Sequence, residues 1–186
     1  MPGLPAPVAP SKTAFFVLEG LNSFATAYYF NYLLFLLRDD YGFSNEKNLA
    51  VAALHGLVYI PASIYGGRFG QRHGNFAALR IGFAGMALGI VVGWAVPSLW
   101  GQCLALGIWT VCLCFTWPML EALVSENEPP DQLPNRVGLY NVVWAGTAAV
   151  GYAAGGWMFE RLGRDSLYWL PLAIHTGQFL STWSLE

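Results

Sequence analysis

The sequence predicts an all-α membrane protein, a polytopic bundle of six transmembrane helices. Charged residues make up only 11% of the 186 residues, less than half of the roughly 25% that soluble domains carry. Hydrophobic residues make up 55%, and the mean hydropathy is +0.44. The apolar residues fall into separate stretches of about 20, the length at which a helix crosses the hydrocarbon core of a bilayer. Because lipid offers no hydrogen-bond partners, each stretch must be a helix rather than a strand.

The N-terminal residues are rich in proline and lack the basic start and short apolar core of a signal peptide. We therefore expect a disordered cytoplasmic lead-in over residues 1–12 and one transmembrane domain over 13–186. The connections between apolar stretches are short, so consecutive helices should be antiparallel neighbours. The expected membrane crossings are 13–37, 49–70, 76–96, 99–124, 137–159 and 166–183.

Small residues recur at every fourth position in two of the expected helices, and this spacing predicts close packing between helices. Pro118 falls inside the fourth expected helix, where its missing backbone N–H tends to produce a kink. Trp144 falls deep in the fifth expected helix, so it must face protein or a cavity. The small residues are Gly85, Gly89 and Gly93 in the third helix and Thr147, Gly151 and Gly155 in the fifth.

The first expected helix carries the best polar stripe, because Glu19, Asn22, Ser23, Thr26 and Tyr29 are spaced to share one helical face. An ionisable group inside a membrane costs several kcal/mol unless it is paired, protonated or hydrated. Two interpretations stay open. The stripe lines a cavity in which Glu19 binds substrate or carries a proton, or Glu19 is a structural acid hydrogen-bonded to a neighbouring helix.

Three further polar residues are buried by their position in the expected helices: His55, Asn141 and His175. We include them with the stripe in the candidate substrate cavity. Histidine changes charge near neutral pH, so either histidine could take part in proton coupling. A lone histidine inside a membrane is, however, more often a hydrogen-bonded packing residue.

Several function classes find no support in the sequence. The net charge of −2 is too small to suggest a nucleic-acid partner. We find no Gly-x-Ser-x-Gly elbow, no His-Glu-x-x-His pair and no P-loop, so we do not expect an enzyme. The three cysteines lie in one apolar run, and the three histidines lie on separate segments. Neither set has the spacing of metal ligands, and we expect no metal and no cofactor.

A basic, glycine-bearing segment, Gly-Arg-Phe-Gly-Gln-Arg-His-Gly over residues 67–74, lies between the second and third expected helices. Gly67, Arg72 and Gly74 match the pattern Gly-x-x-x-Asp-Arg/Lys-x-Gly, and Gln71 replaces the acid. The segment resembles the signature loop between helices two and three of the major facilitator superfamily of transporters. The resemblance implies a cytoplasmic turn that forms part of a gate. Gln71 keeps the hydrogen-bonding capacity of the family's acid but not its charge.

The stretch Glu-Asn-Glu-Pro-Pro over residues 126–130, followed by Arg136, resembles the same family's loop between helices four and five. In the family, a glutamate at the cytoplasmic end of helix four joins the loop arginine in an ion pair. The resemblance therefore implies a pair between Glu126 and Arg72, with Glu121 as the other candidate. The candidate gating residues are Gly67, Gln71, Arg72, Gly74, Glu121, Glu126 and Arg136.

The family fold has two six-helix halves, each built from two inverted three-helix repeats, and the resemblance covers the N-terminal half. It implies a secondary active transporter in the plasma (inner) membrane that moves a small-molecule substrate by alternating access. The partners it implies are the lipid bilayer and a second six-helix half, from the same gene product or a second protomer. Basic residues barely distinguish the two sides of the membrane, so a cytoplasmic N-terminus rests on the resemblance.

The chain stops at Glu186, where a linker to a second half would begin, and we favour a truncated or split product over a dimerising half-transporter. The alternative function is a non-transporting integral membrane subunit or assembly factor. It predicts that the polar stripe is fully hydrogen-bonded to neighbouring helices and that no cavity exists. The sequence leaves the substrate, the coupling ion and the direction of transport open.

Overall fold

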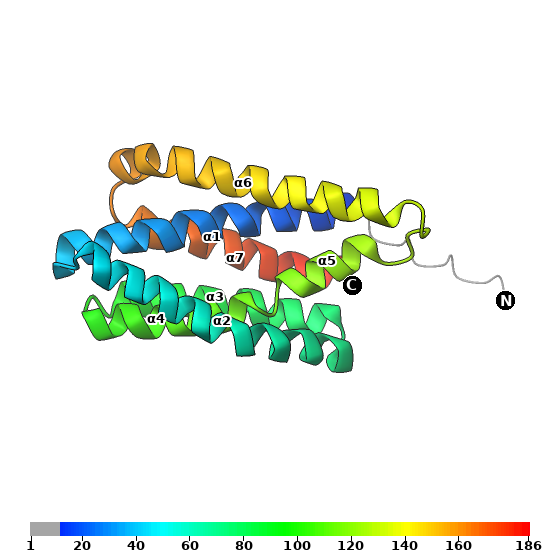
Figure 1. The fold of residues 1–186 in the computed structure, drawn as a ribbon, viewed down its shortest axis with the longest axis horizontal. Helices are drawn as coiled ribbons and strands as arrows, with labels where there is room; N and C mark the ends of the chain where they lie inside the picture. Colours follow the sequence, from blue (N-terminus) through cyan, green and yellow to red (C-terminus); the bar gives the residue numbers. More distant parts are fainter. Residues whose placement is uncertain (1–11) are drawn as a thin grey trace.

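In the computed structural model, which describes residues 12–186, the chain forms seven α-helices joined by short turns (Figure 1). The described residues contain no strand. The expected disordered lead-in lies outside the described residues except for Lys12, which is already the first residue of a helix. The helices are α1 (Lys12–Tyr41), α2 (Asn45–His73), α3 (Asn75–Ala95), α4 (Leu99–Leu113), α5 (Trp117–Ser125), α6 (Leu133–Leu162) and α7 (Ser166–Leu185).

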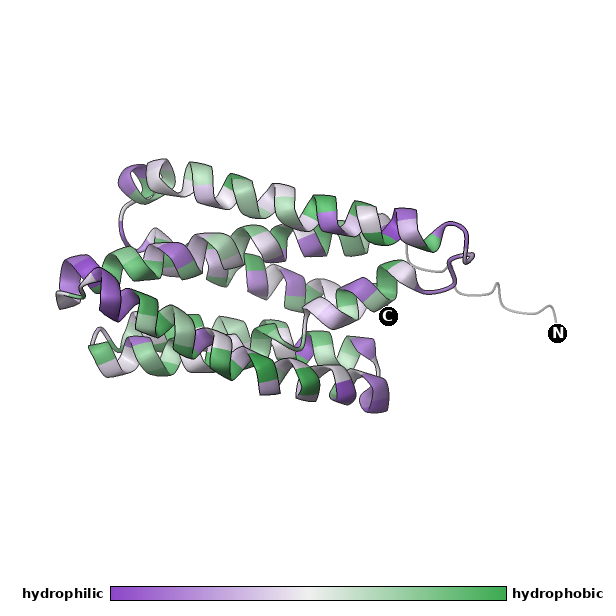
Figure 2. Cartoon of the chain, viewed as in Figure 1, coloured by the Kyte–Doolittle hydropathy of each residue, from purple (hydrophilic) through white to green (hydrophobic). Residues whose placement is uncertain are grey.

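The helices lie side by side along the long axis of one elongated bundle (Figure 1). Helices α4 and α5 follow each other in the same direction, so together they form one rod of the bundle. Helix α1 packs mainly on α6 and α7, α3 packs on α4 and α7, and α2 packs on α4. Hydrophilic residues gather at the turns at both ends of the bundle, whereas its middle is largely apolar (Figure 2). This distribution suits a bundle whose ends reach water on the two sides of a membrane.

Within residues 12–186, three helical stretches are long and apolar enough to cross a membrane: Asn45–His73, Asn75–Ala95 and Leu99–Ser125. The sequence predicted six such crossings. Helices α1, α6 and α7 have sufficient length, with 30, 30 and 20 residues, but they carry more polar side chains. In α1, several of these polar side chains are buried between helices, where neighbouring helices rather than lipid surround them.

The fourth expected helix is interrupted. Helix α4 ends at Leu113 and α5 begins at Trp117, with Pro118 in the first turn of α5. Proline fits the first turn of a helix because its missing N–H has no intrahelical partner there, but it cannot continue the ladder of a preceding helix. The predicted kink at Pro118 is therefore present as a break just before it. By contrast, Pro61 and Pro171 lie inside continuous helices.

Glycines bring helices together as their spacing predicted. A Cβ atom on Gly85 of α3 would lie 2.1 Å from Cys112 Sγ of α4. A Cβ on Gly151 of α6 would lie 2.9 Å from the carbonyl oxygen of Phe24 in α1. Neither separation is possible for real atoms, so these helices can approach this closely only because a side chain is missing.

The turn between α2 and α3 is much shorter than expected. The sequence predicted a basic turn over residues 67–74, but α2 continues to His73 and α3 begins at Asn75. Gly74 alone connects the two helices, at a φ of +94° that glycine adopts readily and other residues rarely adopt. Helix α2 can continue beyond its apolar residues because the polar side chains of its last turn, Gln71 to His73, are exposed. The helix ends only at Gly74, which has the positive φ.

Candidate functional site

Glu19 of α1 is completely buried where α1 packs against α5 and α6. Ser23 Oγ, one turn further along α1, donates to Glu19 Oε1 at 2.5 Å, and the Tyr140 hydroxyl of α6 donates to Oε2 at 2.7 Å. The Tyr140 oxygen also lies 3.3 Å from the carbonyl oxygen of Trp117 in α5. Within residues 12–186, no basic side chain pairs with Glu19. The carboxyl group is thus held by hydroxyl donors alone.

A cavity of about 350 Å³ lies next to this cluster. Its wall includes Trp117 and Tyr140, the two residues that also surround Glu19. Tyr140 thus contacts both the buried carboxyl group and the cavity. We call this space the aromatic cavity. Its lining residues are Tyr59 from α2, Trp117, Pro118 and Glu121 from α5, and Tyr140, Asn141 and Trp144 from α6.

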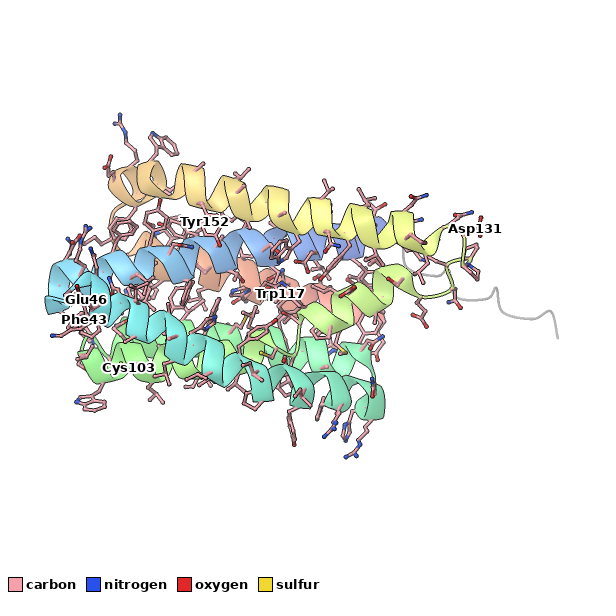
Figure 3. All side chains as sticks on the ribbon, viewed as in Figure 1. Phe43, Glu46, Cys103, Trp117, Asp131 and Tyr152 are labelled. Carbon is pink, nitrogen blue, oxygen red and sulfur yellow. The ribbon has the colours of Figure 1, made fainter. Side chains whose placement is uncertain are left out.

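The cavity lies about halfway along the bundle and is open to the outside. Trp117 is near the middle of the long axis, far from Asp131 at one end and Glu46 at the other (Figure 3). Tyr140 is the eighth residue of α6, which places it about 10 Å along the helix from its first residue at a rise of 1.5 Å per residue. Glu121, Asn141 and Trp144 are exposed, so a solute could enter the cavity from the side of α5 and α6.

Three aromatic rings from three helices meet in the cavity wall. The ring centroids of Tyr59 and Trp117 are 6.1 Å apart at an interplanar angle of 58°. Those of Trp117 and Trp144 are 6.3 Å apart at 74°. Glu121, one turn after Trp117 in α5, is exposed and is the single acidic or basic residue among the lining residues.

The polar stripe of α1 packs against the break between α4 and α5. Asn22 Nδ2 donates to Thr116 Oγ1 at 3.1 Å. The ring of Tyr29 lies 5.2 Å from that of Trp109, centroid to centroid. Thr26 is partly buried, and its hydroxyl oxygen has no hydrogen-bond partner. None of the stripe residues is among the residues that line the aromatic cavity.

His55 lies apart from the aromatic cavity. Its Nδ1 is 2.8 Å from Thr110 Oγ1, whose hydroxyl donates to the carbonyl oxygen of Leu106 at 2.7 Å. Because the threonine has a single hydroxyl hydrogen, the histidine Nδ1–H must be the donor in the first bond. His55 lines a separate, mostly apolar cavity of about 90 Å³.

His175 is a completely buried residue in the contact of α7 with α1 and α3. Its Nδ1 lies 2.9 Å from Gln178 Oε1, and Gln178 Nε2 donates to the carbonyl oxygen of Leu18 at 2.7 Å. Its ring stacks over Phe83 at a centroid distance of 6.4 Å. Of the residues included in the candidate substrate cavity, only Asn141 lines the aromatic cavity, and Glu19 lies directly behind its wall.

The expected ion pair between Glu126 and Arg72 is absent from the described part of the chain. Glu128 forms the ion pairs instead, with Lys12 at 2.5 Å and with Arg136 at 2.9 Å. The physical reason is the close packing of α1 on α6, which brings the starts of both helices to the turn after α5. The hydrogen bond from Lys12 and the charge of Arg136 hold the pKa of the Glu128 carboxyl group below its usual value.

The remaining gating candidates are spread over the surface. Gln71 and Arg72 are exposed in the last turn of α2. Glu121 lines the aromatic cavity rather than the turn. A Cβ on Gly67 would meet no atom within 4 Å, whereas one on its neighbour Gly66 would lie 2.3 Å from the carbonyl oxygen of Cys114. The close contact of α2 with the residue after α4, Cys114, therefore requires glycine at Gly66, which the sequence motif does not include.

Three of the seven residues of the cavity wall, Tyr59, Trp117 and Tyr140, were not predicted from the sequence. Trp144 was expected only as a tryptophan deep in its helix. A usable signal existed, because side chains four residues apart share a helical face. Trp117 and Glu121 have this spacing in α5, and Tyr140 and Trp144 have it in α6.

The fold and this site define a helical integral membrane protein with a cavity about halfway along the bundle. Residues 15–177 match the family model of the Major Facilitator Superfamily. The match covers most of the chain, and the chain therefore belongs to this family, whose members are membrane transporters rather than enzymes. If α4 and α5 are counted as one interrupted helix, the described residues have as many helices as one half of such a transporter. A comparison with curated proteins found no match.

Proposed function

We propose that this chain is the N-terminal half of a secondary active transporter and that the aromatic cavity is its contribution to the path of a small solute. The observation that carries the proposal is a cavity of about 350 Å³ beside a buried acid that has no basic partner. Intramembrane acids are costly and usually mark a substrate or proton pathway.

The helix contacts support two inverted repeats, α1–α2–α3 and α4/α5–α6–α7. Helix α1 packs on α6, and the corresponding α4 packs on α2. Helix α1 also packs on α7, as α4 packs on α3, while α3 and α7 pack on each other. A pseudo-two-fold axis that exchanges the repeats would exchange these pairs. Transporters built from inverted repeats place their substrate sites where the repeats meet.

A second six-helix half would complete the path. Helices α2 and α6 flank the aromatic cavity, and each has only three buried residues. Both present large apolar side chains to the outside, among them Leu57 of α2 and Val142 of α6. The proposed partner, from the same gene product or a second protomer, would cover these faces and rock against them.

The gate would lie on the side of the bundle where α2 ends, which we assign to the cytoplasm of a plasma (inner) membrane protein. Gln71 and Arg72 are exposed there beside the single-residue turn at Gly74. Among the described residues, Arg72 forms no ion pair. Both side chains are thus placed to contact a second half when the gate closes.

Thiol labelling tests whether the cavity reaches water. Asn141→Cys replaces an exposed cavity residue, and Leu139→Cys replaces an exposed apolar residue of the same helix. At 100° per residue the two positions point about 160° apart at nearly the same depth. In membranes, a charged maleimide should label Asn141→Cys faster than Leu139→Cys, counted as added mass above the parent chain with its native cysteines. Equal, slow labelling of both variants would contradict the proposal and favour a non-transporting subunit.

A further inference from the structure

We infer that the aromatic cavity binds organic cations, compounds in which a substituted ammonium group carries the charge. The inference rests on the proposed function, because it names the class of solute for that site. Two properties of the lining carry it: the sign of its charge and the arrangement of its rings.

The charge of the cavity is negative. Glu121 is the single acidic or basic residue in the lining, which contains no lysine, arginine or histidine. The basic residue one turn before Tyr140 is Arg136, whose guanidinium group is engaged with Glu128 at 2.9 Å. No cation of the described residues therefore neutralises the cavity, and an anionic solute would be repelled.

The aromatic rings add a directional attraction. Tyr59, Trp117 and Trp144 come from three different helices and contact each other at angles of 58° and 74°. Within this set, Tyr59 and Trp144 each contact only Trp117, so each keeps one ring face that the other two rings do not cover. The face of an aromatic ring attracts a cation within about 6 Å of its centre, and tryptophan does so most strongly. Rings around a carboxylate form the kind of site that recognises substituted ammonium groups.

Neutral polar solutes fit this cavity less well. A sugar would need many hydrogen-bonding groups, and the lining offers few that are free. The Tyr140 hydroxyl is already engaged with Glu19, which leaves the Asn141 amide, the Tyr59 hydroxyl, the Glu121 carboxylate and the indole N–H of Trp144. The volume of about 350 Å³ lies at the lower end of the range for small-molecule sites, which favours a compact cation.

Three probes of one shape test the inference. Benzyltrimethylammonium carries the positive charge, neopentylbenzene is its neutral carbon counterpart, and phenylmethanesulfonate carries a negative charge. Each would be titrated into the full chain in nanodiscs of zwitterionic lipid by calorimetry, with empty nanodiscs subtracted. Binding of the cation at least tenfold tighter than of both other probes is expected. Equal affinities, or tighter binding of the neutral or anionic probe, would overturn the inference.

Matched variants locate the binding. Glu121→Gln removes the charge of the lining at nearly constant shape, and Glu160→Gln makes the same change at an exposed acid at the end of α6. Trp144→Ala removes a ring of the wall, and Trp157→Ala removes an exposed ring elsewhere on the same helix. We expect the two cavity variants to weaken binding of the cation about tenfold each and the two controls to leave it unchanged.

The two proposals fail in different ways. If Asn141→Cys is labelled but the three probes bind equally well, the proposed transport path stands and the preference for organic cations is contradicted. A cavity that does not label would remove the solute path itself. Cation binding that survives both Glu121→Gln and Trp144→Ala, in variants whose circular dichroism matches the parent, would place the cation elsewhere and overturn the inference.

Discussion

Two buried polar clusters of this bundle look alike at first and differ in their surroundings. Glu19 and His175 are both completely buried, and each is hydrogen-bonded to a polar side chain of its own helix, Ser23 and Gln178 respectively. Glu19 lies behind the wall of a cavity of about 350 Å³. His175 lies under the ring of Phe83, and its partner Gln178 lines a groove of about 590 Å³ between α1 and α7 whose lining has no aromatic and no charged residue.

The difference shows that burial of an ionisable group does not by itself mark a functional site in a membrane bundle. Both groups are candidates by sequence, because both sit at membrane depth. Both have a neighbouring space large enough for a solute, but only the space beside Glu19 is lined by aromatic rings and an acidic residue. His175 is expected to contribute to stability and Glu19 with its neighbours to binding.

The largest effect should come from His175→Ala. The substitution removes a completely buried ring and leaves Gln178 Oε1 without its donor, so we expect unfolding in mixed micelles to become easier by about 2–4 kcal/mol. Binding of benzyltrimethylammonium by the fraction that remains folded should not change. A loss of cation affinity in this variant would mean that the two clusters are functionally coupled.

A smaller loss of stability is expected for Tyr140→Phe. It removes the hydroxyl group that donates to Glu19 Oε2 and should cost about 1–3 kcal/mol, because a buried oxygen loses its partner. The double variant with Glu19→Gln should cost less than the sum of the two single variants, since the two residues share one hydrogen bond. Strict additivity in the same unfolding measurement would show that the bond contributes nothing.

Acid pH should affect a third polar group, at the membrane surface. The pKa of Glu128 is lowered from 4.5, chiefly by the hydrogen bond from Lys12, so the folded state binds this proton less readily than the unfolded state. Its contribution is present above pH 4.5 and is lost as the pH falls below that value, through the pKa of the folded state. The melting temperature should drop more on acidification in the parent than in Glu128→Gln. Identical drops would show that the ion pairs with Lys12 and Arg136 do not contribute.

The smallest effect is expected for Asn141→Ala. Asn141 is exposed on the cavity wall, so its removal should change the free energy of unfolding by no more than about 0.5 kcal/mol. A loss comparable to that of His175→Ala, in the same micelle assay, would place Asn141 in the packing and erase the contrast between the two regions.

Sequence reasoning identified the all-helical architecture, the family and the glycine contacts, because each depends on a local pattern. Gly85 and Gly151 could be assigned to packing from spacing alone. The cavity wall could not be assembled in this way, since it depends on how α2, α5 and α6 are rotated about their axes relative to one another. The ion pair of Glu128 was missed for a related reason. Its partner Lys12 is brought near only by the packing of α1 on α6.

The break before Trp117 has a mechanical consequence. Helix α5 has nine residues, so it is a rod of about 13 Å at a rise of 1.5 Å per residue. One end of this rod carries Trp117, and its other end leads into the turn that contains Glu128. Because α5 is joined to α4 by turn hydrogen bonds, from Phe115 N–H to Cys112 and from Thr116 N–H to Leu113, rather than by a continuous α-helical ladder, a tilt of about 10° would shift the far tip by roughly 2 Å with little bending of its longer neighbour. A displacement of the turn that contains Glu128 could thus change the orientation of the Trp117 indole in the cavity wall.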